Sequence, residues 1–210
     1  MSGNPIFNRA QQELLERARI NDKTVIEALS VIERGTIFAT GGAVLNDGTF
    51  FTLPTNNRWQ SVNFANNSDP KINWVLNKMR MKTTWRSNAL TAVQNADHKV
   101  FLENSYIQLK NNTTVLPPIP LSSLVNYDMH FLEPSYTPIR RTTDWYNFDD
   151  KDVITIEGGS SWEFLFQPYP NQTAGAGVAL QGTGVSGGVT GYYFTLEVSG
   201  LRLTRKISGI

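Results

Sequence analysis

From Thr36 onward, apolar residues recur at every second position, and this period of two limits the fold more than any other feature. Successive side chains of a strand point to opposite faces, so such alternation is typical of strands with one buried face. In Trp162–Gln167 the three aromatic residues share one face, and Glu163 and Gln167 fall on the other. We therefore expect the aromatic face of this strand to lie in a core.

Further strands are predicted from short runs of the same kind that Gly, Pro and Asn interrupt. The predicted strands are Trp59–Phe64, Ile72–Thr83, Lys99–Asn104, Tyr106–Lys110, Leu124–Leu132, Val153–Glu157, Trp162–Gln167 and Tyr192–Ile207. Thr36–Leu53 is expected to form a hairpin that turns at Asn46-Asp47-Gly48. Many short strands without alternating helices predict a mainly β fold, a β-sandwich of jelly-roll type with two sheets face to face.

The last predicted strand changes phase along its length. Its apolar residues from Phe194 to Val198 keep one phase, and Leu201 and Leu203 take the opposite phase. One inserted residue at Ser199-Gly200 would explain the change, because an extra residue in a strand moves the following side chains to the other face. The sequence therefore predicts a β-bulge there.

The first 35 residues have the helical period instead, so we expect a helical arm at 1–35 and a β-sandwich domain at 36–210. Asn4 is the expected N-cap of a first helix, and a second helix is expected from Thr24 to Gly35. These helices either pack on their own domain or dock on a neighbouring subunit or a membrane surface. The arm residues expected at such an interface are Ile6, Phe7 and Leu14.

A long loop is predicted at residues 168–191, which contain seven of the sixteen glycines and no charged residue. We expect it to contact neighbouring subunits through Gly182, Gly184 and Gly187. The segment also matches the G-x-G-x-x-G dinucleotide motif and the G-x-S-x-G nucleophile motif. Both motifs need a helix after the loop, and a strand is predicted there, so neither match indicates a site.

Signals for catalysis and metal binding are weak. The chain has no cysteine and two histidines, which excludes thiolate chemistry and makes a histidine metal site unexpected. Asp149, Asp150 and Asp152 are the candidate metal ligands, but their spacing misses the EF-hand pattern. A solvated acidic turn is expected there, with a metal ion between subunits as the alternative. We expect no cofactor and no enzymatic activity.

A candidate basic contact face lies in the predicted strand Ile72–Thr83, where Lys78, Arg80 and Lys82 occupy alternate positions. Apolar residues hold this phase earlier in the strand, so the strand either bulges near Asn77 or leaves the core. The basic face is expected to be a solvated or partner-facing rim, with contact to single-stranded nucleic acid as the alternative. The chain has 19 basic and 18 acidic residues, which argues against general binding to nucleic acid.

The sequence as a whole resembles the jelly-roll coat proteins of non-enveloped viruses and tailless phages. The resemblance is carried by a helical stretch at Pro5–Glu33, a strand-rich body at Thr36–Ile207, and the neighbouring strands Val153–Glu157 and Trp162–Gln167. It implies a capsid subunit, located in the virion and assembled in the host cytoplasm. Such a subunit assembles with copies of itself and with other virion proteins and needs no cofactor.

Two other kinds of protein fit the same features. A neck, tail, baseplate or decoration protein of a phage would share the composition and the β-rich fold. A carbohydrate-binding β-sandwich would expose aromatic residues such as Trp59, Trp85 or Trp145 on a flat face where sugars stack. Only 18% of the residues are charged, and surfaces poor in charge favour buried interfaces, which is an argument for assembly.

Overall fold

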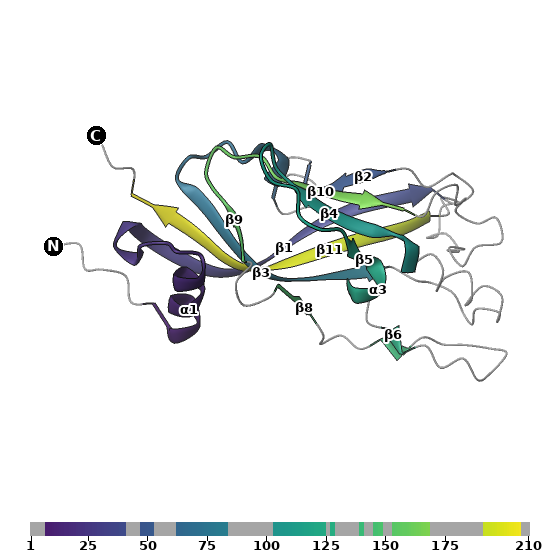
Figure 1. Cartoon of the computed structure of the whole chain (residues 1–210), viewed down its shortest axis with the longest axis horizontal. Helices are drawn as coiled ribbons and strands as arrows, with labels where there is room; N and C mark the ends of the chain where they lie inside the picture. The colour runs from purple at the N-terminus through teal and green to yellow at the C-terminus, as the bar shows by residue number, and fades with distance from the viewer. Residues whose placement is uncertain are drawn as a thin grey trace.

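The computed structural model describes residues 7–40, 47–52, 62–83, 103–124, 127–128, 139–140, 145–148, 153–168 and 191–206. Within them, two antiparallel sheets pack face to face (Figure 1). The side chains between the sheets form a continuous hydrophobic core. The described part of the chain is therefore mainly β with a sandwich architecture, as the alternation predicts.

The chain crosses repeatedly between the two sheets. Its described elements are α1 (Arg9–Arg17), the short 3₁₀ helix η1 (Asp22–Thr24), β1 (Val25–Thr40), β2 (Gly48–Phe50), the 3₁₀ helix η2 (Phe64–Asn66), β3 (Ile72–Thr83), β4 (Tyr106–Lys110), β5 (Ile119–Pro120), α3 (Leu121–Leu124), β6 (Tyr127–Asp128), β7 (Ile139–Arg140), β8 (Tyr146–Asn147), β9 (Ile154–Ile156), β10 (Glu163–Gln167) and β11 (Gly191–Arg205).

The strand pairing is nested. The first sheet has the order β1-β11-β3-β8, with β9 also pairing with β3, and the second sheet has the order β2-β10-β4-β5. Thus β1 pairs with β11, β2 with β10, β3 with β9 and β4 with β5, always antiparallel. Successive pairs of this series lie alternately in the first and the second sheet.

The first sheet is much longer than the second. β1 has 16 residues and β11 has 15, whereas β4 and β10 have five each. At about 3.3 Å per residue, β1 extends for about 50 Å and β10 for about 17 Å. The second sheet therefore covers only part of the first.

The inner face of the first sheet, the face that packs on the second sheet, supplies half of the main core. Phe194, Leu196 and Val198 of β11 lie there. Phe166 of β10 stacks on Phe194 with ring centroids 5.0 Å apart. Phe164 of β10 is completely buried, which confirms that the aromatic residues of this strand face a core.

Helix α1 packs on the opposite, outer face of the first sheet, at the other end of the long strands (Figure 1). Its buried residue Leu15 lies in a second, smaller cluster with Leu201 and Leu203 of β11. Phe7 and Leu14 pack against the same cluster. Phe7 and Leu14, the described interface candidates of the arm, thus contact their own domain. This is one of the two predicted alternatives.

The helix starts and ends with regular caps. Asn8 is the N-cap, and its side chain and that of Gln11 form a reciprocal capping box. At the other end, Arg19 adopts a positive φ of 54°, and the N–H of Ile20 donates to the carbonyl of Leu15. This is a Schellman motif, which satisfies the last carbonyls of the helix. The predicted N-cap, Asn4, lies outside the described residues; Phe7 and Asn8 are not helical, and the described helix begins at Arg9.

The second predicted helix is wrong. Val25–Thr40 forms one continuous strand that pairs with β11 and passes through the predicted domain boundary at residue 35. The four-residue spacing of its apolar side chains resembled a helix face, but pairing with a long partner strand overrides local spacing. Gly35 does not end a helix. It lies in the strand, where a Cβ would come 2.8 Å from the backbone nitrogen of Phe51.

The predicted hairpin over Thr36–Leu53 is also wrong. Its two arms lie in different sheets, because β1 pairs with β11 and β2 pairs with β10. The Asn-Asp-Gly signal at 46–48 predicted a local turn, whereas β1 and β2 both pair with strands that are distant in sequence. This turn signal therefore does not identify the partners of β1 and β2.

The other strand predictions have mixed outcomes. Ile72–Thr83 and Tyr106–Lys110 are confirmed with unchanged bounds, and the strands near 154–156, 163–167 and 191–205 are confirmed within two residues. Residues 62–64 are not a strand, residues 103–104 are helical, and Leu124 ends α3. Of the predicted strand at 124–132, the described strand is Tyr127–Asp128.

The inserted residue predicted in β11 lies in β3 instead. Ser199 pairs with Lys78 and Gly200 with Leu76, so Asn77 is the extra residue. This confirms the alternative that β3 bulges near Asn77. β11 keeps one register with β1 from Gly191 to Thr204. Its apolar pattern changes because Phe194, Leu196 and Val198 face the main core, while Leu201 and Leu203 face α1.

The bulge requires a glycine opposite to it. A Cβ at Gly200 would lie 1.9 Å from the carbonyl oxygen of Val75 and 2.8 Å from the Cα of Leu76. Only a residue without a side chain permits such an approach between strands. Gly200 therefore lets β11 pass the bulge and reach the second cluster without a break in pairing.

Candidate interaction surfaces

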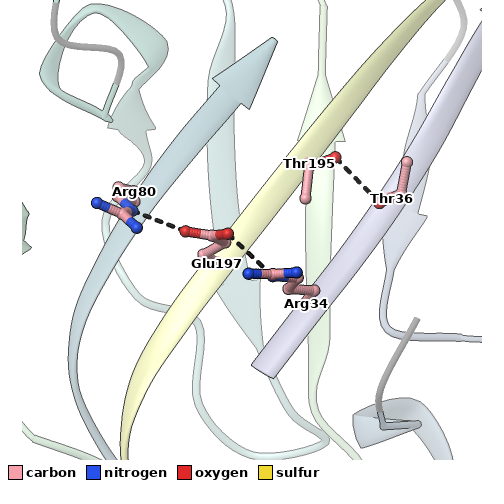
Figure 2. Close-up of polar contacts among 5 residues, drawn as sticks. All are labelled: Arg34, Thr36, Arg80, Thr195 and Glu197. Carbon is pink, nitrogen blue, oxygen red and sulfur yellow. Dashed lines mark hydrogen bonds and ion pairs between the residues drawn. The ribbon is translucent and has the colours of Figure 1, made fainter. Parts of the chain in front are cut away.

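An ion cluster lies on the outer face of the first sheet, opposite to the face on which Leu196 and Val198 enter the main core (Figure 2). Glu197 of β11 is flanked in the sheet by Arg34 of β1 and Arg80 of β3. The Nε atom of Arg34 donates to one carboxylate oxygen at 3.0 Å, and that of Arg80 donates to the other at 2.7 Å. One carboxylate thus joins three neighbouring strands.

The three charged side chains differ in exposure. The side chain of Glu197 is 1% exposed, that of Arg80 is 18% exposed and that of Arg34 is 62% exposed. A carboxylate this deeply buried needs paired donors, because burial of an unpaired charge costs several kcal/mol. The two arginines supply these donors to Glu197, and Arg34 is the more exposed of the two.

Two neighbouring contacts complete this surface. The ring of Trp145 lies under the guanidinium carbon of Arg80, 4.2 Å from the ring centroid. The hydroxyl groups of Thr36 and Thr195 lie 3.1 Å apart in the next register position (Figure 2). The cation–π contact with Trp145 orients the guanidinium group of Arg80 and shields one side of it. Trp145, a predicted sugar-stacking residue, therefore has a partner within its own chain.

The structure gives a structural role to one residue of the predicted basic face. Lys78, Arg80 and Lys82 of β3 pair in register with Ser199, Glu197 and Thr195 of β11. Arg80 is committed to Glu197 and Trp145, whereas Lys78 is half-buried. A role of these residues in contact with a partner or with single-stranded nucleic acid stays a prediction.

A pocket of about 520 Å³ opens at the edge of the sandwich where the outer strands of both sheets meet. The second sheet contributes Pro117, Pro118 and Ile119, and the first sheet contributes Tyr146 and Phe148. Trp162, which follows both groups in sequence, also lines the pocket. The pocket residues that the structure describes carry no charge and offer hydroxyl groups from Thr114, Ser123, Tyr146 and Thr155. Such a lining suits an uncharged ligand.

The free edge of β1 is the third candidate surface. β11 pairs with one edge of β1, and none of the described strands pairs with the other. Ile26, Leu29 and Ile32 of this strand are 50%, 42% and 52% exposed. Apart from Val115, they are the large apolar side chains that the described part of the chain exposes. Exposed apolar residues thus concentrate on one edge strand.

Several predicted site residues lie outside the described residues. These are Ile6, the loop residues Gly182, Gly184 and Gly187, the acidic residues Asp149, Asp150 and Asp152, and the aromatic residues Trp59 and Trp85. Among the residues that are described, no group of three His, Asp or Glu side chains is placed to share a metal ion. Over the same residues, none of the helices is long and apolar enough to cross a membrane.

The sequence patterns do not predict the ion cluster or the pocket. Glu197 does carry a local signal, since it interrupts the apolar residues Leu196 and Val198 in a strand with two buried faces. A charge in such a context indicates a buried pair. Its partners are 163 and 117 positions away, so the sequence gives no indication of their identity.

Comparison with known proteins does not supply a family for this chain. No protein-family model matches the sequence, and no curated protein matches it either.

Proposed function

We propose that the chain is a virion structural protein, a capsid subunit with jelly-roll topology that assembles with copies of itself. The observation that carries the proposal is the nested pairing of β1 with β11, β2 with β10, β3 with β9 and β4 with β5. A jelly roll consists of two four-stranded sheets wound from one folded ribbon of strand pairs. The alternation of successive pairs between the two sheets is what this winding produces.

The surface of the molecule supports assembly as the use of this fold. A jelly roll hosts many functions, so its role has to be argued from particular surfaces. Here an edge strand exposes three large apolar side chains, and the chain as a whole has few charged residues. Both features favour burial against other proteins. The proposal includes location in the virion, no cofactor and no enzymatic activity.

Electron microscopy of the purified full-length protein tests the proposal. Closed shells of uniform size, formed as the protein is concentrated, are expected for a capsid subunit. Rings or tubes would instead identify a neck, tail or baseplate component, which is the alternative within the same class. Single particles of monomer size at every concentration would contradict self-assembly altogether.

A carbohydrate-binding β-sandwich is the second candidate, and the pocket at the edge of the sandwich favours it. The pocket combines aromatic rings with hydroxyl groups, as neutral sugars require. Phe148 and Trp162 are only 8% and 7% exposed, however, so Tyr146 is the aromatic ring most open to stacking. Binding of the protein to a sugar array, abolished by Tyr146→Ala, would favour this function over assembly if the protein also stays monomeric.

A further inference from the structure

We infer that the free edge of β1 is a self-association site, where two copies of the chain pair their β1 strands antiparallel and join their first sheets. The inference deepens the proposed function and rests on it, since it names the contact through which subunits would assemble. Unpaired edges offer a row of backbone donors and acceptors that a further strand can satisfy.

The positions of the exposed apolar residues favour a partner that lies along the edge. Register with β11 is continuous from Glu27 onward, so successive side chains of β1 alternate between the two faces. Leu29, opposite Arg202, therefore lies on the inner face, and Ile32, opposite Ser199, lies on the outer face. A partner that docks on one face would cover only one of them. A strand placed beside β1 would contact both.

The charge pattern of the edge suits a second copy. Residues 28–32 read Ala-Leu-Ser-Val-Ile and carry no charge, and Glu27 and Glu33 flank them. Two such runs can face each other without like charges in opposition. A two-fold axis makes this contact isologous. The exposed apolar residues of each copy then contact the β1 edge of the other copy.

The charges at the two ends of the run select a register. In an antiparallel pair centred on Ser30, Glu27 of one copy would lie directly opposite Glu33 of the other, which is unfavourable. A pair centred on Val31 places Glu27 opposite Gly35 and Glu33 opposite Leu29. Val31 then faces its own copy, and β-branched pairs across strands are favourable. We therefore expect the two-fold axis at Val31.

The helix leaves this part of the edge available. Gln11 of α1 donates from its side-chain amide to the carbonyl of Ala28 at 2.9 Å, so α1 contacts the backbone of β1 at the start of the uncharged run. Both Leu29 and Ile32, which follow Ala28, remain exposed in the presence of α1. The helix therefore borders the proposed contact and does not cover it.

Disulfide trapping tests the inference, because the chain has no cysteine of its own. Single cysteines are placed at each of positions 29–33 in the full-length protein, and disulfide-linked dimers are measured after mild oxidation. Opposite residues in an antiparallel pair lie about 4.5–5.5 Å apart at Cβ, close to the span of a disulfide. We expect a peak at Val31→Cys, at least tenfold above Val115→Cys, the matched control at an exposed apolar position outside β1.

A second pair of variants tests the contact without cross-linking. Leu29→Lys and Ile32→Lys replace exposed side chains, so the monomer should stay folded, while the added charges oppose edge pairing. We expect the dissociation constant for self-association to rise at least tenfold for both variants and to stay unchanged for Val115→Lys.

The outcomes separate this inference from the proposed function. Large assemblies without cross-links at any of positions 29–33 would overturn β1 self-pairing and leave the capsid proposal standing. Cross-linked dimers that never form larger assemblies would support β1 pairing and contradict the capsid proposal. Backbone amides of β1 that are protected from hydrogen exchange in the assembly, without cross-links, would mean that a different strand covers the edge, which also overturns self-pairing.

Discussion

The two ends of the first sheet are stabilised on opposite faces. At one end the inner face packs on the second sheet, and Phe164, Phe166 and Phe194 fill the space between them. At the other end the outer face packs on α1 through Leu15. The same strand, β11, contributes to both clusters because its even-numbered residues face one and Leu201 and Leu203 face the other. A long strand can thus support two cores without changing its phase.

The difference indicates which end defines the fold. The sandwich end is closed by strands that pair with distant parts of the chain, whereas the helix end is closed by one nine-residue helix. An isolated helix of this length is marginal in water and depends on packing for its stability. We therefore expect changes at the sandwich end to destabilise the whole domain, and changes at the helix end to act more locally.

The largest effect is expected at the sandwich end, for Phe164→Ala. Removal of this completely buried ring leaves a cavity between the sheets and should lower the free energy of unfolding by about 3–5 kcal/mol. Chemical denaturation monitored by tryptophan fluorescence measures the change. Leu165→Ala, the next residue on the opposite side of the strand, is the control and should cost less than half as much. Equal costs would mean that the strand does not have one core face.

The junction between the two ends is tested by Gly200→Ala. The added methyl group would overlap the carbonyl oxygen of Val75, so β11 and β3 must separate at the bulge, at a cost of about 3 kcal/mol. Ser199→Ala, one residue earlier, should change the free energy of unfolding by less than about 0.5 kcal/mol. A tolerated alanine at position 200 would show that the strands pass each other differently there.

At the helix end, Leu15→Ala should lower the free energy of unfolding by about 2–3 kcal/mol, since Leu15 is the buried residue of α1. Hydrogen exchange measures where the loss occurs. Faster exchange is expected in α1 and at the start of β1, with the amides of β10 unchanged. A uniform increase across both ends would contradict the separation of the two clusters.

The smallest effect is expected at the ion cluster on the outer face. Glu197→Gln keeps the shape of the side chain but removes the charge that both arginines contact. It should cost about 1.5–2 kcal/mol, in the lower part of the range for hydrogen bonds to charged groups, because Arg34 is mostly exposed. Arg34→Ala should cost less than about 1 kcal/mol, because this side chain is mostly solvent-exposed. If Arg34→Ala cost as much as Glu197→Gln in thermal or chemical unfolding, the burial of the cluster would not control its contribution.

The sequence predicted well the strands whose pattern arises from one core. Tyr106–Lys110 and the aromatic strand near Trp162 follow simple alternation, and both lie in the second sheet with one face buried. It failed at β1. Val25, Leu29 and Ile32 of this strand are spaced like a helix face, but Leu29 and Ile32 are exposed, and of the three only Val25 lies in a hydrophobic cluster.

The candidate surfaces depend on contacts that no local pattern encodes. The partners of Glu197 come from strands far away in sequence, and the pocket combines the outer strands of two different sheets. The nested order of the strands is likewise a property of long-range pairing. The turn signal at Asn46-Asp47-Gly48 instead favoured a local hairpin that the chain does not form.

The mass of the full-length protein in solution, measured by light scattering over a concentration series, tests self-assembly most directly. A capsid subunit should show a mass that rises with concentration toward one large, closed assembly. Leu29→Lys should shift this rise to higher concentration if β1 forms the contact. A mass equal to one chain, 23.5 kDa, at every concentration would contradict the proposal that this protein builds a shell from copies of itself.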